Sequence, residues 1–135
     1  WTTNWPTACI QAYGIKAERL AFMGLDTIIT GNLTPLFQYR GPLAVPRDPY
    51  HPEDPCNGVV LCPPRPDIVE TPSASDMRVL DGFKKDYLDD IFPGFVKSYK
   101  VHVVPQGLGD ARIVYFHGVP KPCDLDEPWI TREWR

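Results

Sequence analysis

Short apolar runs separated by turn-forming residues dominate the first half of the chain. Residues 19–23 form such a run with a break after it, which predicts a buried strand. Residues 27–30 are threonine and isoleucine only, and these β-branched side chains favour extended backbone. Residues 58–62 form a further apolar run between Asn-Gly and Pro-Pro turns, and residues 43–45 form a weaker one. The pattern predicts a series of short strands.

A helical pattern follows these runs. Residues 72–76 carry serine and aspartate, which suit the start of a helix. Beyond them, apolar side chains recur at steps of three and four residues, which is typical of a half-buried helix. These side chains are Met77, Leu80, Phe83, Tyr87 and Ile91. We expect a helix here, divided at Gly82 and ended by Pro93 and Gly94.

The last third alternates between apolar and polar positions in two places. Residues 96–104 alternate in the manner of a strand. Residues 111–117 alternate less cleanly, and an extended backbone would put Ile113, Tyr115 and His117 on one face and Val114 and Phe116 on the other.

Strands and helices are therefore mixed, and the first half contains no complete crossover helix. We predict an α/β or α+β chain in which a mixed sheet is flanked by helices, forming one domain over residues 1–135. Ten of the sixteen prolines lie between Pro35 and Pro72, so the middle third is expected to be rich in loops and poor in long central strands.

Composition narrows the classes of function. A net charge of -3 argues against a nucleic-acid binder, which usually has a basic face. No apolar run approaches the roughly 20 residues of a membrane span, and no leader pattern is visible at the N-terminus. The spacing of the four cysteines matches no zinc pattern; we favour free, mostly buried thiols over two disulfides. A cytoplasmic protein is expected.

Asp26 is the first candidate for chemistry, because it comes directly after an apolar strand. A carboxylate at the carboxyl end of a buried strand points into the crevice where open α/β sheets bind ligands. A turn residue that merely ends the strand is the alternative. The segments around Asp26 favour the first interpretation.

Four segments, in the same order, resemble the motifs of metal-dependent glycosyltransferases of the GT-A fold, especially the glycogenin-like group (family 8) and related bacterial and phage proteins. Residues 26–37 resemble the segment that carries and follows the Asp-x-Asp motif. Residues 56–61 resemble the family's Asn-Ser-Gly or Asn-Thr-Gly strand, and residues 75–76 the start of its Asp-Gln helix. Residues 113–122 resemble the closing His-Phe-x-Gly-x-x-Lys-Pro-Trp motif.

The resemblance implies transfer of a hexose from a nucleotide-diphosphate sugar to an unknown acceptor, with Mn²⁺ or Mg²⁺. A divalent ion and a lysine would stabilise the negative charge that builds on the departing diphosphate. Carried over position by position, it assigns Asp26 as a metal ligand, Asn57, Gly118 and Lys121 as cofactor-binding residues and Asp76 as the catalytic residue. Asn57 and Asp76 are expected on the acceptor side of the pocket, and His117 is expected as the second metal ligand.

The chain departs from the family pattern in places that matter. The first aspartate of Asp-x-Asp falls on Gly24, which has no ligand atom, and the metal-binding histidine falls on Tyr115. His117, two residues later, would share a face with Tyr115 in an extended segment, so it is able to supply the imidazole. The closing tryptophan falls on Cys123, and the glutamine after Asp76 falls on Met77.

The resemblance covers residues 17–130 and excludes the family's upstream nucleotide-binding half, which supplies the uridine pocket. Two functions therefore stay open: a nucleotide-sugar glycosyltransferase, and a non-catalytic descendant that serves as a subunit of a larger assembly such as a virus particle. Purely structural roles also stay open: His117 as a residue that ends a strand, and Lys121 as a solvated loop residue. Trp129 and Trp134 are interpreted as packing residues rather than sugar platforms.

Overall fold

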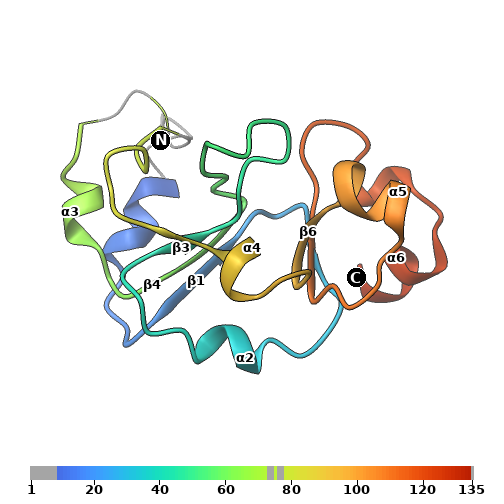
Figure 1. Ribbon diagram of the computed structural model, residues 1–135, viewed down its shortest axis with the longest axis horizontal. Helices are drawn as coiled ribbons and strands as arrows, with labels where there is room; N and C mark the ends of the chain where they lie inside the picture. Colours follow the sequence, from blue (N-terminus) through green and yellow to red (C-terminus); the bar gives the residue numbers. More distant parts are fainter. Residues whose placement is uncertain (1–8, 73–74, 76–77, 135) are drawn as a thin grey trace, which may run out of the picture.

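The computed structural model describes residues 9–72, 75 and 78–134, and its strands form two sheets (Figure 1). The first sheet has the order β1-β4-β3-β5, and its strands are β1 (Leu20–Met23), β4 (Val59–Cys62), β3 (Ala44–Val45) and β5 (Asp86–Tyr87). The second sheet has the order β2-β7-β6, and its strands are β2 (Thr27–Ile29), β7 (Ile113–Tyr115) and β6 (Val96–Ser98).

Both sheets are mixed. In the first, β4 pairs antiparallel with β1 and β3, whereas β3 and β5 are parallel. In the second, β7 pairs antiparallel with β2 and parallel with β6. The predicted class, mixed strands flanked by helices, is therefore confirmed. The helices are short: α2 (Thr34–Phe37), α3 (Pro66–Val69), α4 (Leu88–Ile91), α5 (Val104–Gln106) and α6 (Pro128–Glu133).

The core consists of three layers of side chains separated by the two sheets. Alternate residues of β4 enter different layers, with Val60 and Cys62 on the outer face of the first sheet and Val59 and Leu61 on its inner face. The inner layer also contains residues of β7, so it packs between the sheets. The other face of β7 contributes to the third layer, beneath α6. In Figure 1, α3 lies at one end of the long axis and α5 and α6 at the other.

The predicted alternation in residues 111–117 is confirmed, and it shows why this segment is so apolar. Ile113 and Tyr115 enter the layer between the sheets, whereas Val114 and Phe116 enter the third layer. All four are buried. A strand that is covered on both faces needs apolar side chains at successive positions. The alternation of apolar and polar residues is therefore less regular in this segment.

The long helix predicted after residue 76 is wrong where the structure describes it; Met77 lies outside the described residues. Residues 78–83 form turns, β5 pairs with β3, and helix begins again only at Leu88. The apolar stripe is divided between two layers, because Leu80 packs in the outer layer and Leu88 between the sheets. A continuous helix could not place both there and still give β3 its parallel partner.

The strand predicted over residues 96–104 is correct only in its first part. It ends at Ser98, whose Oγ accepts a hydrogen bond from the backbone N–H of Val101. The chain then turns into η2, a π-helix over Tyr99–Val103, and continues into α5. A serine that can cap a turn competes with the strand at this position. No described helix is long and apolar enough to cross a bilayer.

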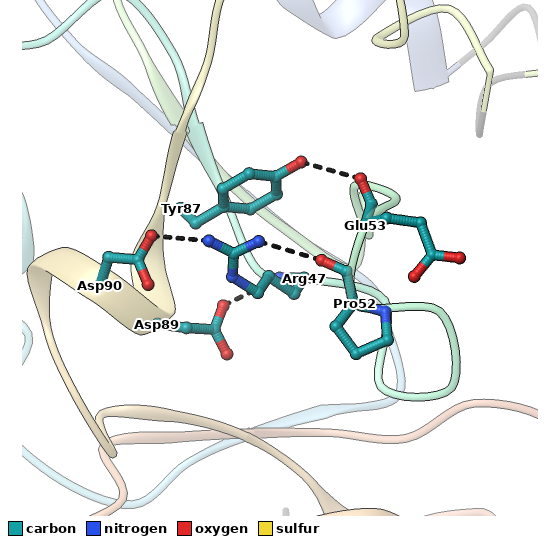
Figure 2. Close-up of polar contacts among 6 residues, drawn as sticks. All are labelled: Arg47, Pro52, Glu53, Tyr87, Asp89 and Asp90. Carbon is teal, nitrogen blue, oxygen red and sulfur yellow. Dashed lines mark hydrogen bonds and ion pairs between the residues drawn. The ribbon is translucent and has the colours of Figure 1, made fainter.

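Figure 2 shows how Arg47 holds the loop between β3 and β4. Its guanidinium donates to the carbonyl oxygen of Pro52 at 3.0 Å and to Asp90 at 2.8 Å. It also lies 3.9 Å from the centre of the Tyr87 ring. The backbone N–H of Arg47 donates to Asp89 at 2.8 Å. One side chain thus ties the loop to β5 and α4.

We predict that Arg47→Gln lowers the free energy of unfolding by about 2 kcal/mol, because the cation–π contact and two charged hydrogen bonds are lost together at a half-exposed position. Urea unfolding of the two proteins measures this difference. Arg40→Gln is a matched control, since Arg40 is two-thirds exposed and lies 4.0 Å from its carboxylate partner. Equal losses in the two variants would show that Arg47 does not hold the loop.

Candidate functional site

A cavity of about 960 Å³ opens where the two sheets meet. Its walls come from β1 and the turn after it, from the start of β4, from the end of β7 and from the segment that leads into η3 (Pro122–Asp124). The lining is mostly apolar, with a few polar groups among them, as ligand sites usually are. The polar side chains named in the sequence analysis that line it are Asp26, Asn57, His117 and Lys121.

The turn at residues 24–26 connects the sheets and presents Asp26. The backbone N–H of Gly24 donates to the carbonyl oxygen of Gly58 at 3.0 Å, which holds the turn to β4. The backbone N–H of Phe116 donates to the carbonyl oxygen of Asp26 at 3.1 Å, which holds it to the end of β7. The backbone is therefore fixed on both sides, and the Asp26 side chain is left to face the cavity.

Lys121 forms an ion pair with Asp26, although the two residues are far apart in sequence. The chain turns back after His117 through Gly118, whose φ of 62° is in the left-handed region, and through a cis bond between Val119 and Pro120. Asp124 accepts the backbone N–H of Lys121 at 2.8 Å and fixes the end of this turn. Glycine is required in the turn because other residues rarely adopt such a φ.

His117 is held by Ser98. Its Nε2 lies 2.8 Å from Ser98 Oγ, and Ser98 is wholly buried. Burial lowers the pKa of the imidazole, and the nearby Lys100 ammonium lowers it further, while Asp48 and Asp26 oppose the shift. The ring also meets Tyr50 edge-on at 5.3 Å, so the loop held by Arg47 covers one side of the imidazole.

Tyr115, at the position of the family's metal-binding histidine, is buried in the layer between the sheets. Burial raises the pKa of its phenol well above its ordinary value, so the phenolate is strongly disfavoured. Its ring lies 3.5 Å from where a Cβ would stand on Gly58, which is an ordinary van der Waals distance. Tyr115 therefore packs as an aromatic side chain and offers no anionic ligand.

At Gly24 the Asp26 carboxylate lies close against the backbone, where a side chain at position 24 would begin. A Cβ added to Gly24 would lie 2.8 Å from Asp26 Oδ1 and 3.6 Å from Thr27 Oγ1. Thr27 Oγ1 is the one buried side-chain polar atom in the described part of the chain that has no hydrogen-bond partner. A side chain at position 24 would thus stand between a carboxylate and an unsatisfied hydroxyl.

Two predicted site residues stand apart from the others. Gly118 is not among the cavity-lining residues, but its turn carries Lys121 to Asp26. Asp76, the proposed catalytic residue, lies outside the described residues. Trp134 lines the cavity, and its interpretation as a packing residue stays a prediction. Trp129 packs in the third layer and donates to Glu127 at 2.6 Å.

Sequence reasoning missed Ser98, Lys100 and Tyr50, all of which act on His117. The expected strand over residues 96–104 would have put Ser98 and Lys100 on one face, and this shared face was the available signal. The four cysteines are free, as predicted, but only Cys56 and Cys62 are buried.

The donor set fits a divalent metal ion poorly. Asp26 already pairs with Lys121, and one nitrogen of His117 is engaged by Ser98. Across residues 9–72, 75 and 78–134 there is no group of three or more histidine, cysteine or carboxylate side chains that could hold a metal. Six oxygen ligands are usual for Mg²⁺, so the described residues alone supply too few.

No family model and no curated protein sequence matches the chain. Among solved structures, the fold is similar to that of the glycosyltransferase GlyE from Streptococcus pneumoniae TIGR4, with a TM-score of 0.59 and 19% sequence identity. The match covers 86% of this chain and 38% of the GlyE chain. The chain therefore has a glycosyltransferase-like fold and spans less than half of that protein. Its assignment to the glycogenin-like group stays a prediction.

We predict that the protein loses stability on acidification below pH 6.5. Burial lowers the pKa of both His102 and His117 from the ordinary value of 6.5, so the unfolded chain binds protons more readily than the folded one. The free energy of unfolding is thus highest above pH 6.5, the ordinary pKa, and it decreases as the pH falls from there through the lowered pKa values of the folded protein. Urea unfolding at several pH values between about 7.5 and 5.5 tests this.

The double variant His102→Gln, His117→Gln isolates the histidine contribution. Its free energy of unfolding should fall less steeply over the same pH range, because neither glutamine takes up a proton. An unchanged slope would assign the acid sensitivity to other groups.

Proposed function

We propose that this chain forms part of a glycosyltransferase that transfers a hexose from a nucleotide-diphosphate sugar. One observation carries the proposal: Asp26, Asn57 and the His117–Lys121 turn come from three separate motif segments, yet they meet at one cavity. The likeness of fold to a glycosyltransferase supports it independently. Because the chain spans 38% of GlyE, the base of the nucleotide is proposed to bind a part of the protein outside this sequence.

In this proposal, each polar side chain at the cavity has a role that suits one group of the nucleotide sugar. Lys121 supplies a positive charge beside the diphosphate oxygens, where negative charge builds as the sugar departs. Asn57 offers an amide for hydrogen bonds with sugar hydroxyls. His117, held by Ser98, orients a ring nitrogen at the cavity wall. The apolar walls lower the effective dielectric constant beside these groups relative to bulk water, which strengthens each of these electrostatic interactions.

Mn²⁺ or Mg²⁺ bound by Asp26 and His117 remains a proposal that the described donor set supports weakly. When bound, such an ion would neutralise charge on the diphosphate. Two protein ligands are too few, so the nucleotide oxygens and other groups would have to complete the coordination. The roles given above rest on the side chains alone.

A second candidate is a non-catalytic subunit of a larger assembly. It is favoured by one observation, that the two positions corresponding to family metal ligands are Gly24, with no side chain, and Tyr115, a buried phenol. The two candidates differ in whether the protein turns over a nucleotide sugar, not in whether the fold is retained.

Thermal unfolding with uridine diphosphate glucose, with and without Mn²⁺, tests the first candidate. A ligand that binds only the folded protein adds about 2.7 kcal/mol of stability at a hundred times its Kd, so the midpoint should rise. Uridine, which lacks the phosphates, is the control and should produce no such rise. No shift with the nucleotide sugar under either condition would contradict the proposal.

Asp26→Ala tests the proposed metal. If Asp26 holds Mn²⁺, the variant should lose any part of the nucleotide affinity that depends on Mn²⁺, as measured by calorimetric titration. Affinity that depends on Mn²⁺ and is equal in the two proteins would remove Asp26 from the metal site.

Gly24→Asp should restore metal affinity. Its backbone is not in the left-handed region, and the nearest atom to the new Cβ is the end of the Asp26 side chain, which is able to move. Two adjacent carboxylates repel each other until a cation lies between them. We therefore expect the variant to be less stable than the parent without metal and to gain more from Mn²⁺.

Gly24→Asn is the matched control, since it adds a side chain of the same size without the charge. If Gly24→Asp folds but gains no more from Mn²⁺ than Gly24→Asn does, Gly24 does not occupy a lost ligand position. The second candidate, a non-catalytic subunit of a larger assembly, would then be the better-supported function.

A further inference from the structure

Lys100 is a half-buried lysine whose side chain has no partner among the described residues, and no part of the proposed function uses it. It lies in the π-helix η2, two residues after Ser98. Within the described part of the chain it makes no hydrogen bond and no ion pair, unlike Lys121, which pairs with Asp26. Interruptions of the π type are frequent at functional sites in proteins.

The position of Lys100 brings a second ammonium group to the turn that carries Lys121. A Cβ added to Gly118 would lie only 3.3 Å from Lys100 Nζ, so this glycine gives the lysine its room. The same Gly118 takes the left-handed φ that turns the chain towards Lys121. One glycine thus permits the approach of both lysines to the His117 end of the cavity.

Among the described residues, the acids that act on His117 form no ion pair with Lys100. Asp26 is engaged by Lys121. Asp48, on the loop held by Arg47, accepts the backbone N–H groups of Tyr50 and His51 at 2.8 and 3.0 Å. Like charges held close together disfavour each other, and an anion bound between them relieves the repulsion.

We propose that Lys100 and Lys121 together bind the diphosphate group of a nucleoside diphosphate at the His117–Gly118 edge of the cavity, without a divalent cation. The class of ligand rests on the proposed function; the anion site rests on the two lysines and Gly118. The lysines supply the positive charge that the poorly fitting metal site does not. Asp26 competes with the bound phosphate for Lys121, so it acts against anion binding.

This competition can be tested by whether pyrophosphate affinity rises or falls when Asp26 is replaced. In EDTA, with inorganic pyrophosphate as the probe, Asp26→Asn should bind about threefold tighter or more, because Lys121 loses its internal partner. Calorimetric titration of the full chain gives both affinities, and a thermal midpoint confirms that each variant is folded.

Lys100 is tested in the same titration. Lys100→Gln should weaken pyrophosphate binding by about tenfold, and Lys100→Arg, which keeps the charge, should recover most of it. Lys97→Gln is the matched control, because Lys97 lies on β6 and donates to the carbonyl oxygen of Leu108 instead. It removes the same charge from the neighbouring element and should leave the affinity within about twofold.

Several results would overturn the inference: no pyrophosphate binding in EDTA, equal losses in Lys100→Gln and Lys97→Gln, or weaker binding by Asp26→Asn. These results are separate from failure of the proposed function. If uridine diphosphate glucose binds only with Mn²⁺ and Lys100→Gln has no effect, the proposed function stands and this inference fails. If pyrophosphate binds through Lys100 but the nucleotide sugar binds no better than pyrophosphate, the anion site stands and the proposed donor is wrong.

Discussion

The three-residue crossing at residues 24–26 is the constraint on which the site depends. β1 ends at Met23 in the first sheet, and β2 begins at Thr27 in the second. So short a connection forces the two sheets together at this point. Backbone hydrogen bonds from Gly24 to Gly58 and from Phe116 to Asp26 then join the crossing to β4 and to the end of β7. Polar residues from three parts of the chain meet there because these backbones cannot separate.

β4 and β7 could be predicted because their burial is complete. β4 is buried at every position and β7 is buried on both faces, so each appears in the sequence as a short apolar run. The helix predicted after residue 76 had an equally clear spacing, yet spacing does not say which layer a side chain enters. Leu80 and Leu88 enter different layers, and this division is a property of the tertiary structure.

Only the site residues that belong to local sequence motifs could be predicted. Asp26, Asn57, His117 and Lys121 each belong to a segment with a recognisable pattern, and all four line one cavity. Ser98 and Lys100 belong to no such segment. Their approach to His117 depends on the strand ending at Ser98 and on the π-helix that follows, which alternating hydrophobicity does not predict. Contacts made by an irregular turn have no sequence period that could reveal them.

Because residue 24 is a glycine, Asp26 is the one carboxylate in the crossing at residues 24–26, and this determines what Asp26 does in the folded protein. Two carboxylates placed this close would repel each other, and a divalent ion between them would balance their charge. The charge of one carboxylate is balanced by a single ammonium group, and Lys121 of the same chain supplies it. The folded protein is then balanced at this point without a bound ion. The same ion pair holds the 117–121 turn against the crossing, so Asp26 helps to fix the wall of the cavity.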